Sequence, residues 1–137
     1  MAEDRILAGY RTVDSVAPVQ LYAGEKQVVT TQGVVSSGQV LGLLNAQGTT
    51  SKFPIVALVN GELVEYDSAG AGAVAMPYGV LPHALDTSAT GYNADVDSPV
   101  IIEGVLNYDA LDTTETYADL KEVFAVSPTG IVIQKLY

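Results

Sequence analysis

The chain has no cysteine and a single histidine, His83, in 137 residues. Disulfides and thiolate metal sites are therefore excluded, and folding must rest on packing. No stretch reaches the run of about 18 apolar residues that a membrane span needs. The N-terminus, Met1–Arg5, opens with acids where a secretory signal has a basic region. We expect a soluble protein made in the cytoplasm.

Basic residues are scarce: six lysines and arginines stand against 16 acids, for a formal net charge of −10. This charge repels phosphate backbones and argues against nucleic-acid partners. From Asp86 to Glu122 there are nine acids and only Lys121, so nine minus one leaves eight net negative charges in that region. We interpret it as a solvated outer face that keeps an assembly soluble. Cation binding is the alternative.

Sets of residues that could perform catalysis are also scarce. His83 follows Pro82, has no cysteine to pair with, and meets no Gly-x-Ser-x-Gly elbow. Arginine occurs only at Arg5 and Arg11, outside the expected folded part, where neither could hold a phosphate group. We therefore expect His83 to be a surface or turn residue, and the protein not to be an enzyme.

Two glycine- or acid-containing segments imitate ligand motifs without completing them. Gly70–Ala75 has the letters of a dinucleotide fingerprint, but Pro77 interrupts the helix that would follow. Asn93–Asp97 resembles the start of a calcium loop, whose sixth and twelfth positions require glycine and glutamate but hold Ser98 and Gly104. We expect no cofactor and no dedicated metal site.

Short apolar runs rich in Val, Ile, Leu and Tyr, separated by 13 glycines and six prolines, predict a mainly β domain. The strongest local signal is a hairpin in which Asn60-Gly61 joins Ile55–Val59 to Glu62–Tyr66, since Asn-Gly suits a type I′ turn. Loops are expected at 68–73 and 86–98. Further strands are expected at 27–31, 34–35, 40–44, 74–81, 100–106 and 131–133.

One helix is expected from about Thr114 to Ala125, capped by Thr113 or Thr114, because Leu120 and Phe124 recur at the helical period. The fold class is therefore mainly β (α+β). We expect a small β-sandwich or barrel-like domain of short strands over residues 27–137, with this C-terminal helix.

Residues 1–26 are expected to form an extended N-terminal arm. Its apolar residues are too many for a free tail, and Pro18 restricts any strand here to an edge position. Two interpretations stay open: the arm packs on its own domain, or it adds a strand to the sheet of a partner.

The order of several segments resembles the head decoration proteins of tailed bacteriophages, the family of the lambda capsid-stabilising protein. In chain order these segments are Gly38–Gly42, Tyr66-Asp67, Gly79–Leu81, Asp86–Ser88 and Val100–Gly104. Leu111, the final helix and Gly130-Ile131 follow them. The resemblance spans about residues 25–133. The chain departs from the pattern at Asn45–Asn60, a longer excursion that contains Phe53-Pro54.

This resemblance implies a homotrimer that cements the expanded icosahedral head of a phage. It would sit on the outer surface of the virion at threefold and quasi-threefold positions, after synthesis in the host cytoplasm. Its partner would be the major capsid protein, with no cofactor, nucleic acid or membrane. The capsid-binding residues would lie in the arm, namely Ile6, Leu7, Tyr10, Val13, Val16, Pro18, Val19, Leu21 and Tyr22.

A different function class stays open beside this one. Tyrosines in loops can offer stacking faces to sugars, as in a glycan- or cell-surface-binding β-module. The tyrosines concerned are Tyr66, Tyr78, Tyr92 and Tyr108.

Overall fold

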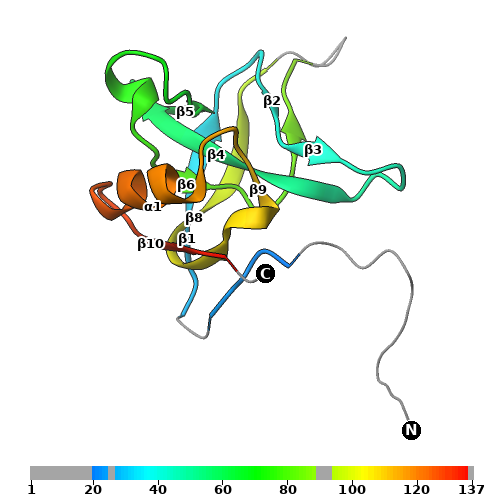
Figure 1. The fold of residues 1–137 in the computed structure, drawn as a ribbon. Coiled ribbons are helices and arrows are strands. Elements are labelled where there is room, and N and C mark those ends of the chain that lie inside the picture. The colour runs from blue at the N-terminus through cyan, green and yellow to red at the C-terminus, as the bar shows by residue number, and fades with distance from the viewer. Residues whose placement is uncertain (1–19, 25–26, 89–93, 136–137) are drawn as a thin grey trace, which may run out of the picture.

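The computed structural model describes residues 20–24, 27–88 and 94–135 (Figure 1). Within them strands predominate and there is one α-helix, α1 (Tyr117–Ala125), which confirms the mainly β class with a C-terminal helix. Two 3₁₀ turns are η1 (Gly72–Ala75) and η2 (Tyr108–Ala110). The strands are β1 (Val29–Val35), β2 (Val40–Leu41), β3 (Leu43–Leu44), β4 (Thr50–Val59), β5 (Glu62–Glu65), β6 (Gly79–Val80), β7 (Leu85–Asp86), β8 (Val96–Asn107), β9 (Leu111–Asp112) and β10 (Gly130–Gln134).

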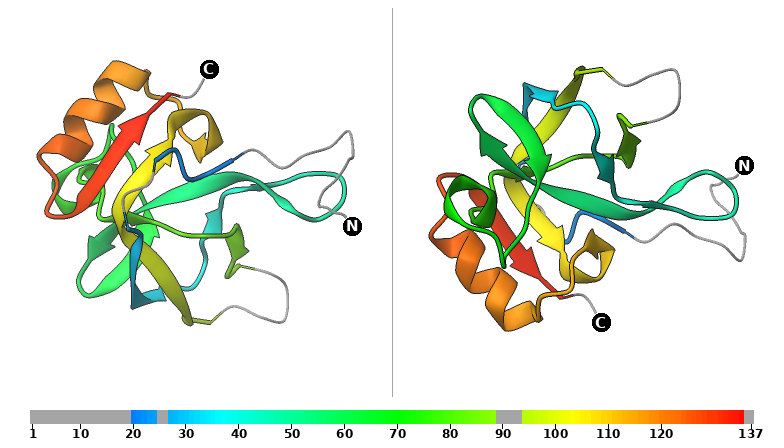
Figure 2. Two further views of the ribbon diagram at one scale, coloured as in Figure 1. Left: turned by 90° about the horizontal axis from the view of Figure 1, so that it is seen from below. Right: turned by 90° about the horizontal axis from the view of Figure 1, so that it is seen from above.

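The main sheet closes on itself because the first strand pairs with β8. The order of neighbours is β1-β5-β4-β6-β8, and β1 also runs antiparallel to β8 from Val29 opposite Glu103 to Val35 opposite Val96. Closure leaves few free edges in this part of the sheet. β10 then adds to β8 in parallel, and α1 lies beside it at one end of the molecule (Figure 2).

The predicted hairpin is confirmed as β4–β5. Its two turn residues, Asn60 and Gly61, have φ angles of 51° and 82°. A two-residue turn with both φ angles positive matches the twist of the flanking strands, and asparagine and glycine adopt such angles at low cost. This local chemistry explains why the sequence alone located the hairpin.

Two apolar clusters lie on opposite faces of the sheet. Successive residues of a strand point to opposite sides, so Ile101 joins one cluster and Val100 the other. On β4, Ile55 and Val56 divide in the same way. The helix covers the first cluster through two buried side chains, those of Leu120 and Phe124.

The strand expected over residues 74–81 is present only in part, as β6 at Gly79–Val80. Its first two expected residues, 74–75, belong to η1 instead. Proline at position 77 has no N–H to give to a ladder, which limits the pairing. Gly79 is needed where pairing resumes, because a Cβ there would lie 2.5 Å from Val100 Cγ1.

The helix begins later than the sequence indicated. Its N-cap is Thr116, whose Oγ1 accepts a hydrogen bond from the N–H of Asp119 at 3.2 Å. The expected cap residue Thr113 instead accepts from the N–H of Glu115 at 3.1 Å. Thr113 therefore closes a turn before the helix, a competing use of the threonine hydroxyl.

Candidate interaction site

The beginning of the described chain is attached to the sheet by a single β-bridge. Tyr22 bridges Leu106 of β8 in the antiparallel sense. Two backbone hydrogen bonds flank the bridge, from Ala23 N–H to the Val105 carbonyl at 2.9 Å and from Asn107 N–H to the Leu21 carbonyl at 2.7 Å. Residues 21–23 are therefore held at a defined place on β8.

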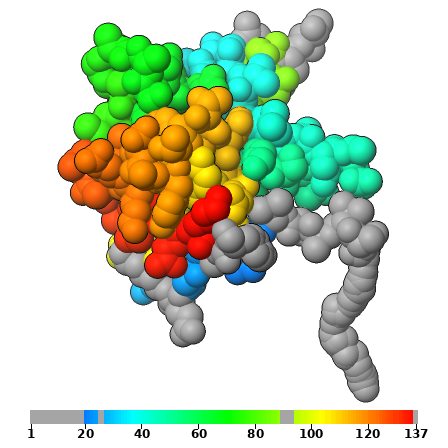
Figure 3. All heavy atoms as spheres, viewed as in Figure 1, coloured from blue at the N-terminus to red at the C-terminus, as the bar shows by residue number. Residues whose placement is uncertain are grey.

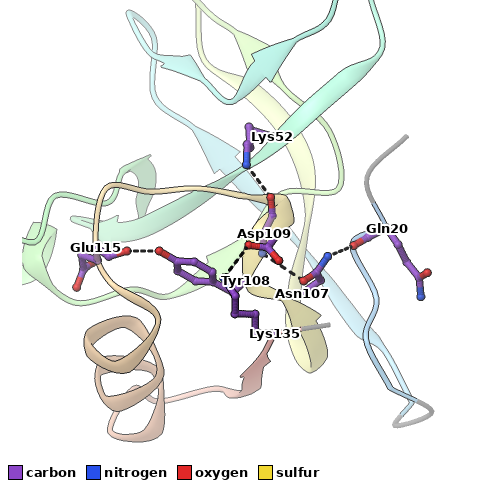
Figure 4. A network of polar contacts seen from close by, with 7 residues as sticks. All are labelled: Gln20, Lys52, Asn107, Tyr108, Asp109, Glu115 and Lys135. Carbon is purple, nitrogen blue, oxygen red and sulfur yellow. Dashed lines mark hydrogen bonds and ion pairs between the residues drawn. The ribbon is translucent and has the colours of Figure 1, made fainter. Parts of the chain in front are cut away.

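The side chain of Asn107 stabilises this attachment of the N-terminal segment to β8. The residue is fully buried, and its Nδ2 donates to the carbonyl of Gln20 at 2.8 Å (Figure 4). Its Oδ1 accepts from the N–H of Asp109 at 3.2 Å, which starts η2. One buried amide thus couples the N-terminal segment to the turn that follows β8.

Two lysines extend the same network through Asp109. Lys52 Nζ donates to the Asp109 carbonyl at 2.6 Å, and Lys135 Nζ lies 3.3 Å from Asp109 Oδ1. Lys135 also lies 5.2 Å from the ring centroid of Tyr108. The Lys135 ion pair is solvent-exposed and contributes little stability. The network nevertheless brings Gln20 and Lys135, near the two ends of the described chain, to one corner (Figure 4).

The structure describes two of the nine residues predicted to bind a capsid. Leu21 is 6 % exposed and packs in the same cluster as Phe124, so its side chain serves the core of this domain. Tyr22 is 40 % exposed. The segment that contains them lies within the range 1–26 assigned to the arm. The residues outside the described part are Ile6, Leu7, Tyr10, Val13, Val16, Pro18 and Val19.

An acidic hollow of about 330 Å³ lies between the end of β5 and the segment before α1. None of its lining residues is positively charged. Burial raises the pKa of Glu65, and Asp112 and Asp67 add repulsion in the same direction. The residues that line the hollow are Glu65, Tyr66, Asp67, Ser68, Asp112, Thr113, Thr114 and Glu115.

Two residues that line the acidic hollow, Tyr66 and Glu115, each have a buried polar atom. Tyr66 Oη and Glu115 Oε2 are buried, and neither forms a hydrogen bond of ordinary geometry in the described part of the chain. Burial raises the pKa of the Tyr66 phenol, and the adjacent Glu115 carboxylate raises it further. Both effects disfavour a phenolate in this site.

The remaining polar candidates lie apart from one another. His83 is half-buried in a bend, with Nδ1 3.2 Å from the carbonyl of Ala84. Asp95 Oδ1 accepts from the N–H of Ser37, and Asp97 lies on β8. Across residues 20–24, 27–88 and 94–135, no three His, Asp or Glu side chains are placed to hold a metal ion.

Three of the four tyrosines considered for stacking on sugars are half-buried. Tyr66 and Tyr108 pack against the first apolar cluster, and Tyr78 packs against the second. Tyr108 also meets Tyr117 edge-to-face, with ring centroids 5.6 Å apart. Tyr92 lies outside the described residues. The glycan-binding hypothesis stays a prediction that a glycan array can test.

Two apolar surfaces were not found by sequence reasoning, because their residues have the character of core residues. The first, here called the Leu43 surface, encloses about 230 Å³ and is lined by Val40, Leu41, Gly42, Leu43, Leu44, Ala84, Leu85 and Asp86. The second, here called the Met76 hollow, measures about 420 Å³ and is lined by Leu58, Ala73, Met76, Pro77, Tyr78 and Pro128. The leucine pair flanked by glycine and asparagine turns was the available signal for the first.

No protein-family model matches this chain, and no curated protein is significantly similar to it. In the part of the chain that the structure describes, no helix is long and apolar enough to cross a membrane. The anchored N-terminal segment and the surfaces described above are therefore the basis for a functional proposal.

Proposed function

We propose that this protein is a capsid-decoration protein of a tailed bacteriophage. It forms a homotrimer on the outer surface of the expanded head, at threefold and quasi-threefold sites, and stabilises the shell without catalysing a reaction. The resemblance of residues 25–133 to that family suggests the assignment. The observation that carries it is the attachment of the N-terminal segment to β8.

The attachment supports the proposal because it presents the arm from a fixed point. Tyr22 bridges Leu106 with a backbone hydrogen bond on either side, and Asn107 Nδ2 donates to the carbonyl of Gln20. If residues 6–19 were fully extended, they would span roughly 45–50 Å at about 3.3–3.6 Å per residue. A domain of this length has a radius of gyration of about 14 Å, so the arm can reach well beyond its own domain.

The chemistry of the arm suits strand addition to a neighbouring protein. Its apolar residues fit pockets on alternate sides of an added strand, while the backbone supplies hydrogen bonds. Pro18 is compatible with an edge position because it lacks an N–H. Several arms on one trimer bind with avidity, so individually weak contacts together clamp neighbouring coat subunits.

The test is co-sedimentation of the purified protein with undecorated expanded phage heads. A variant that lacks residues 1–19 keeps Gln20, Leu21 and their bonds to β8. We expect it to keep its fold and oligomeric state and to lose binding to the heads. If full-length protein stays in the supernatant at every concentration, the proposal is wrong.

A pair of substitutions separates arm contacts from charge effects. Val16→Asp places a carboxylate at a predicted contact position, and Ser15→Asp places the same charge one residue away. We expect Val16→Asp to reduce binding at least tenfold and Ser15→Asp to reduce it less than threefold. Equal losses would indicate that the arm does not use its apolar residues.

A further inference from the structure

Five exposed apolar side chains gather at two separate places in the fold, whereas Tyr22, Val34, Val126 and Val132 are exposed elsewhere. On the Leu43 surface, Val40, Leu43 and Leu44 are 52–62 % exposed. In the Met76 hollow, Leu58 and Met76 are 40 % and 41 % exposed. The first lies on β2 and β3, and the second lies by η1 and the loop after α1, and the two share no lining residue. In Figure 3 the helix and the loop after it are at the left and the β3–β4 hairpin is at the right. One copy therefore cannot cover one surface with the other.

The distribution of charge favours a second copy of this chain as the occupant. Two copies that each carry −10 repel each other, except where the facing surfaces are nearly free of acids. All six residues lining the Met76 hollow are uncharged, and Asp86 is the only charged residue lining the Leu43 surface. The acidic hollow, by contrast, has four carboxylates and no cation among its lining residues.

Hydrogen bonds within the chain define the turn beside the Leu43 surface. Asn45 Oδ1 accepts hydrogen bonds from the N–H groups of Gln47 and Thr49 at 2.9 and 3.0 Å, which fixes the turn between β3 and β4. Lys52, opposite Leu43 in the pairing of β3 with β4, is tied to Asp109 through its side chain. A surface ordered in advance loses little entropy on docking.

We propose that the Leu43 surface of one copy docks into the Met76 hollow of the next copy. The two surfaces differ, so the contact is head-to-tail, and such contacts close into a ring when the rotation between copies permits. The number of copies, three, rests on the proposed function, whereas the pairing of the two surfaces does not.

The exposed apolar side chains supply only part of the area that a stable interface needs. Complete burial of one aliphatic side chain removes roughly 60–120 Å² from water at about 25 cal/mol per Å². Five side chains that are about half exposed therefore supply on the order of 150–300 Å², against about 1,600 Å² in a typical stable interface. A single contact of this kind is too weak to hold a dimer. In a closed ring every copy uses both surfaces, so removing one copy breaks two contacts.

Cysteine cross-linking tests the pairing directly, because the chain has no cysteine of its own. Leu44→Cys and Met76→Cys are prepared as separate single-cysteine proteins, mixed, and treated with a short bis-maleimide. We expect the mixture to give a cross-linked pair at least tenfold more efficiently than either protein alone. Equal cross-linking of each protein with itself, or no mixed product, would overturn the proposal.

Sedimentation velocity gives a second test with a matched control. We expect wild-type protein to sediment as one closed oligomer with no populated dimer, and Leu44→Glu to shift it to monomer. Gln47→Glu adds the same charge on the exposed turn of the same hairpin and should leave the oligomer intact. A monomeric wild type, or an oligomer that survives Leu44→Glu, contradicts the pairing. If Leu44→Glu fails to fold by circular dichroism, the cross-linking result decides.

These outcomes are separable from those of the capsid proposal. A wild-type ring that passes both tests but does not sediment with heads removes the capsid proposal and leaves the surface pairing in place. Protein that sediments with heads but gives no mixed cross-link removes the surface pairing and leaves the capsid proposal in place.

Discussion

The buried amide of Asn107 makes the sharpest prediction about stability. Asn107→Ala removes two hydrogen bonds at once, the one to the carbonyl of Gln20 and the one from the N–H of Asp109. Each loss leaves a polar backbone group short of a partner in a region shielded from water, at about 1–3 kcal/mol for a fully buried group. Because Gln20 is itself exposed, we expect a total of about 2–4 kcal/mol.

Asn45→Ala is the matched control, because Asn45 also makes two hydrogen bonds to backbone N–H groups, in an exposed turn. There water replaces the lost partner, so the expected cost is below about 1 kcal/mol. The measurement is urea unfolding followed by circular dichroism, with the denaturant slope checked for constancy. Similar costs for Asn107→Ala and Asn45→Ala would refute the reasoning that burial sets the difference.

Three further predictions concern the acidic hollow, the helix and the closest approach of two strands. The raised pKa of Glu65 means that the native state binds the Glu65 proton more tightly than the unfolded state does. The stability that this proton contributes is complete below about pH 4.5 and is lost as the pH rises. The Glu65→Gln variant should therefore unfold at a higher urea concentration than wild type at pH 7, and at the same urea concentration at pH 3. Thr116→Ala should lower the free energy of unfolding by about 1 kcal/mol, because the N-cap of α1 is lost. Thr114→Ala, two positions earlier, should change it little in the same urea titration. Gly79→Ala should lower the melting temperature by at least about 5 °C, because its Cβ would lie 2.7 Å from the carbonyl oxygen of Ile101 on rigid backbone; an unchanged melting temperature would contradict that close approach.

Local chemistry decided which elements the sequence could predict. The turn at Asn60-Gly61, the periodic helix residues and the β-branched runs each encode their structure within a few positions. The strand expected over residues 74–81 is shortened to Gly79–Val80 because Pro77 has no N–H for a ladder and residues 74–75 belong to η1. The helix begins later than expected because the Thr113 hydroxyl accepts a hydrogen bond within the preceding turn, from the N–H of Glu115, and Thr116 is the residue that caps the helix.

The surfaces were harder to predict because they depend on pairings between distant segments. The acidic hollow forms where residues 65–68 meet residues 112–115, and composition showed only that acids are plentiful. The apolar surfaces were hidden because a leucine looks the same in a sequence whether the fold buries it, like Leu41, or exposes it, like Leu44. Leu21 shows the converse, since the sequence left open whether the predicted arm packs on its own domain, and the fold places this residue in the core.

The attachment of the N-terminal segment to β8 has a consequence for how the chain is made. Gln20 and Asn107, which meet at this attachment, are 87 positions apart in sequence. At about 5–20 residues per second, a ribosome needs roughly 4–17 s to synthesise that interval. During that time the segment at residues 20–23 has been synthesised but β8, with which it pairs, has not. Folding can therefore finish only after most of the chain has been translated. Domains dominated by such distant pairings complete folding in about milliseconds to seconds, which makes synthesis the slower step.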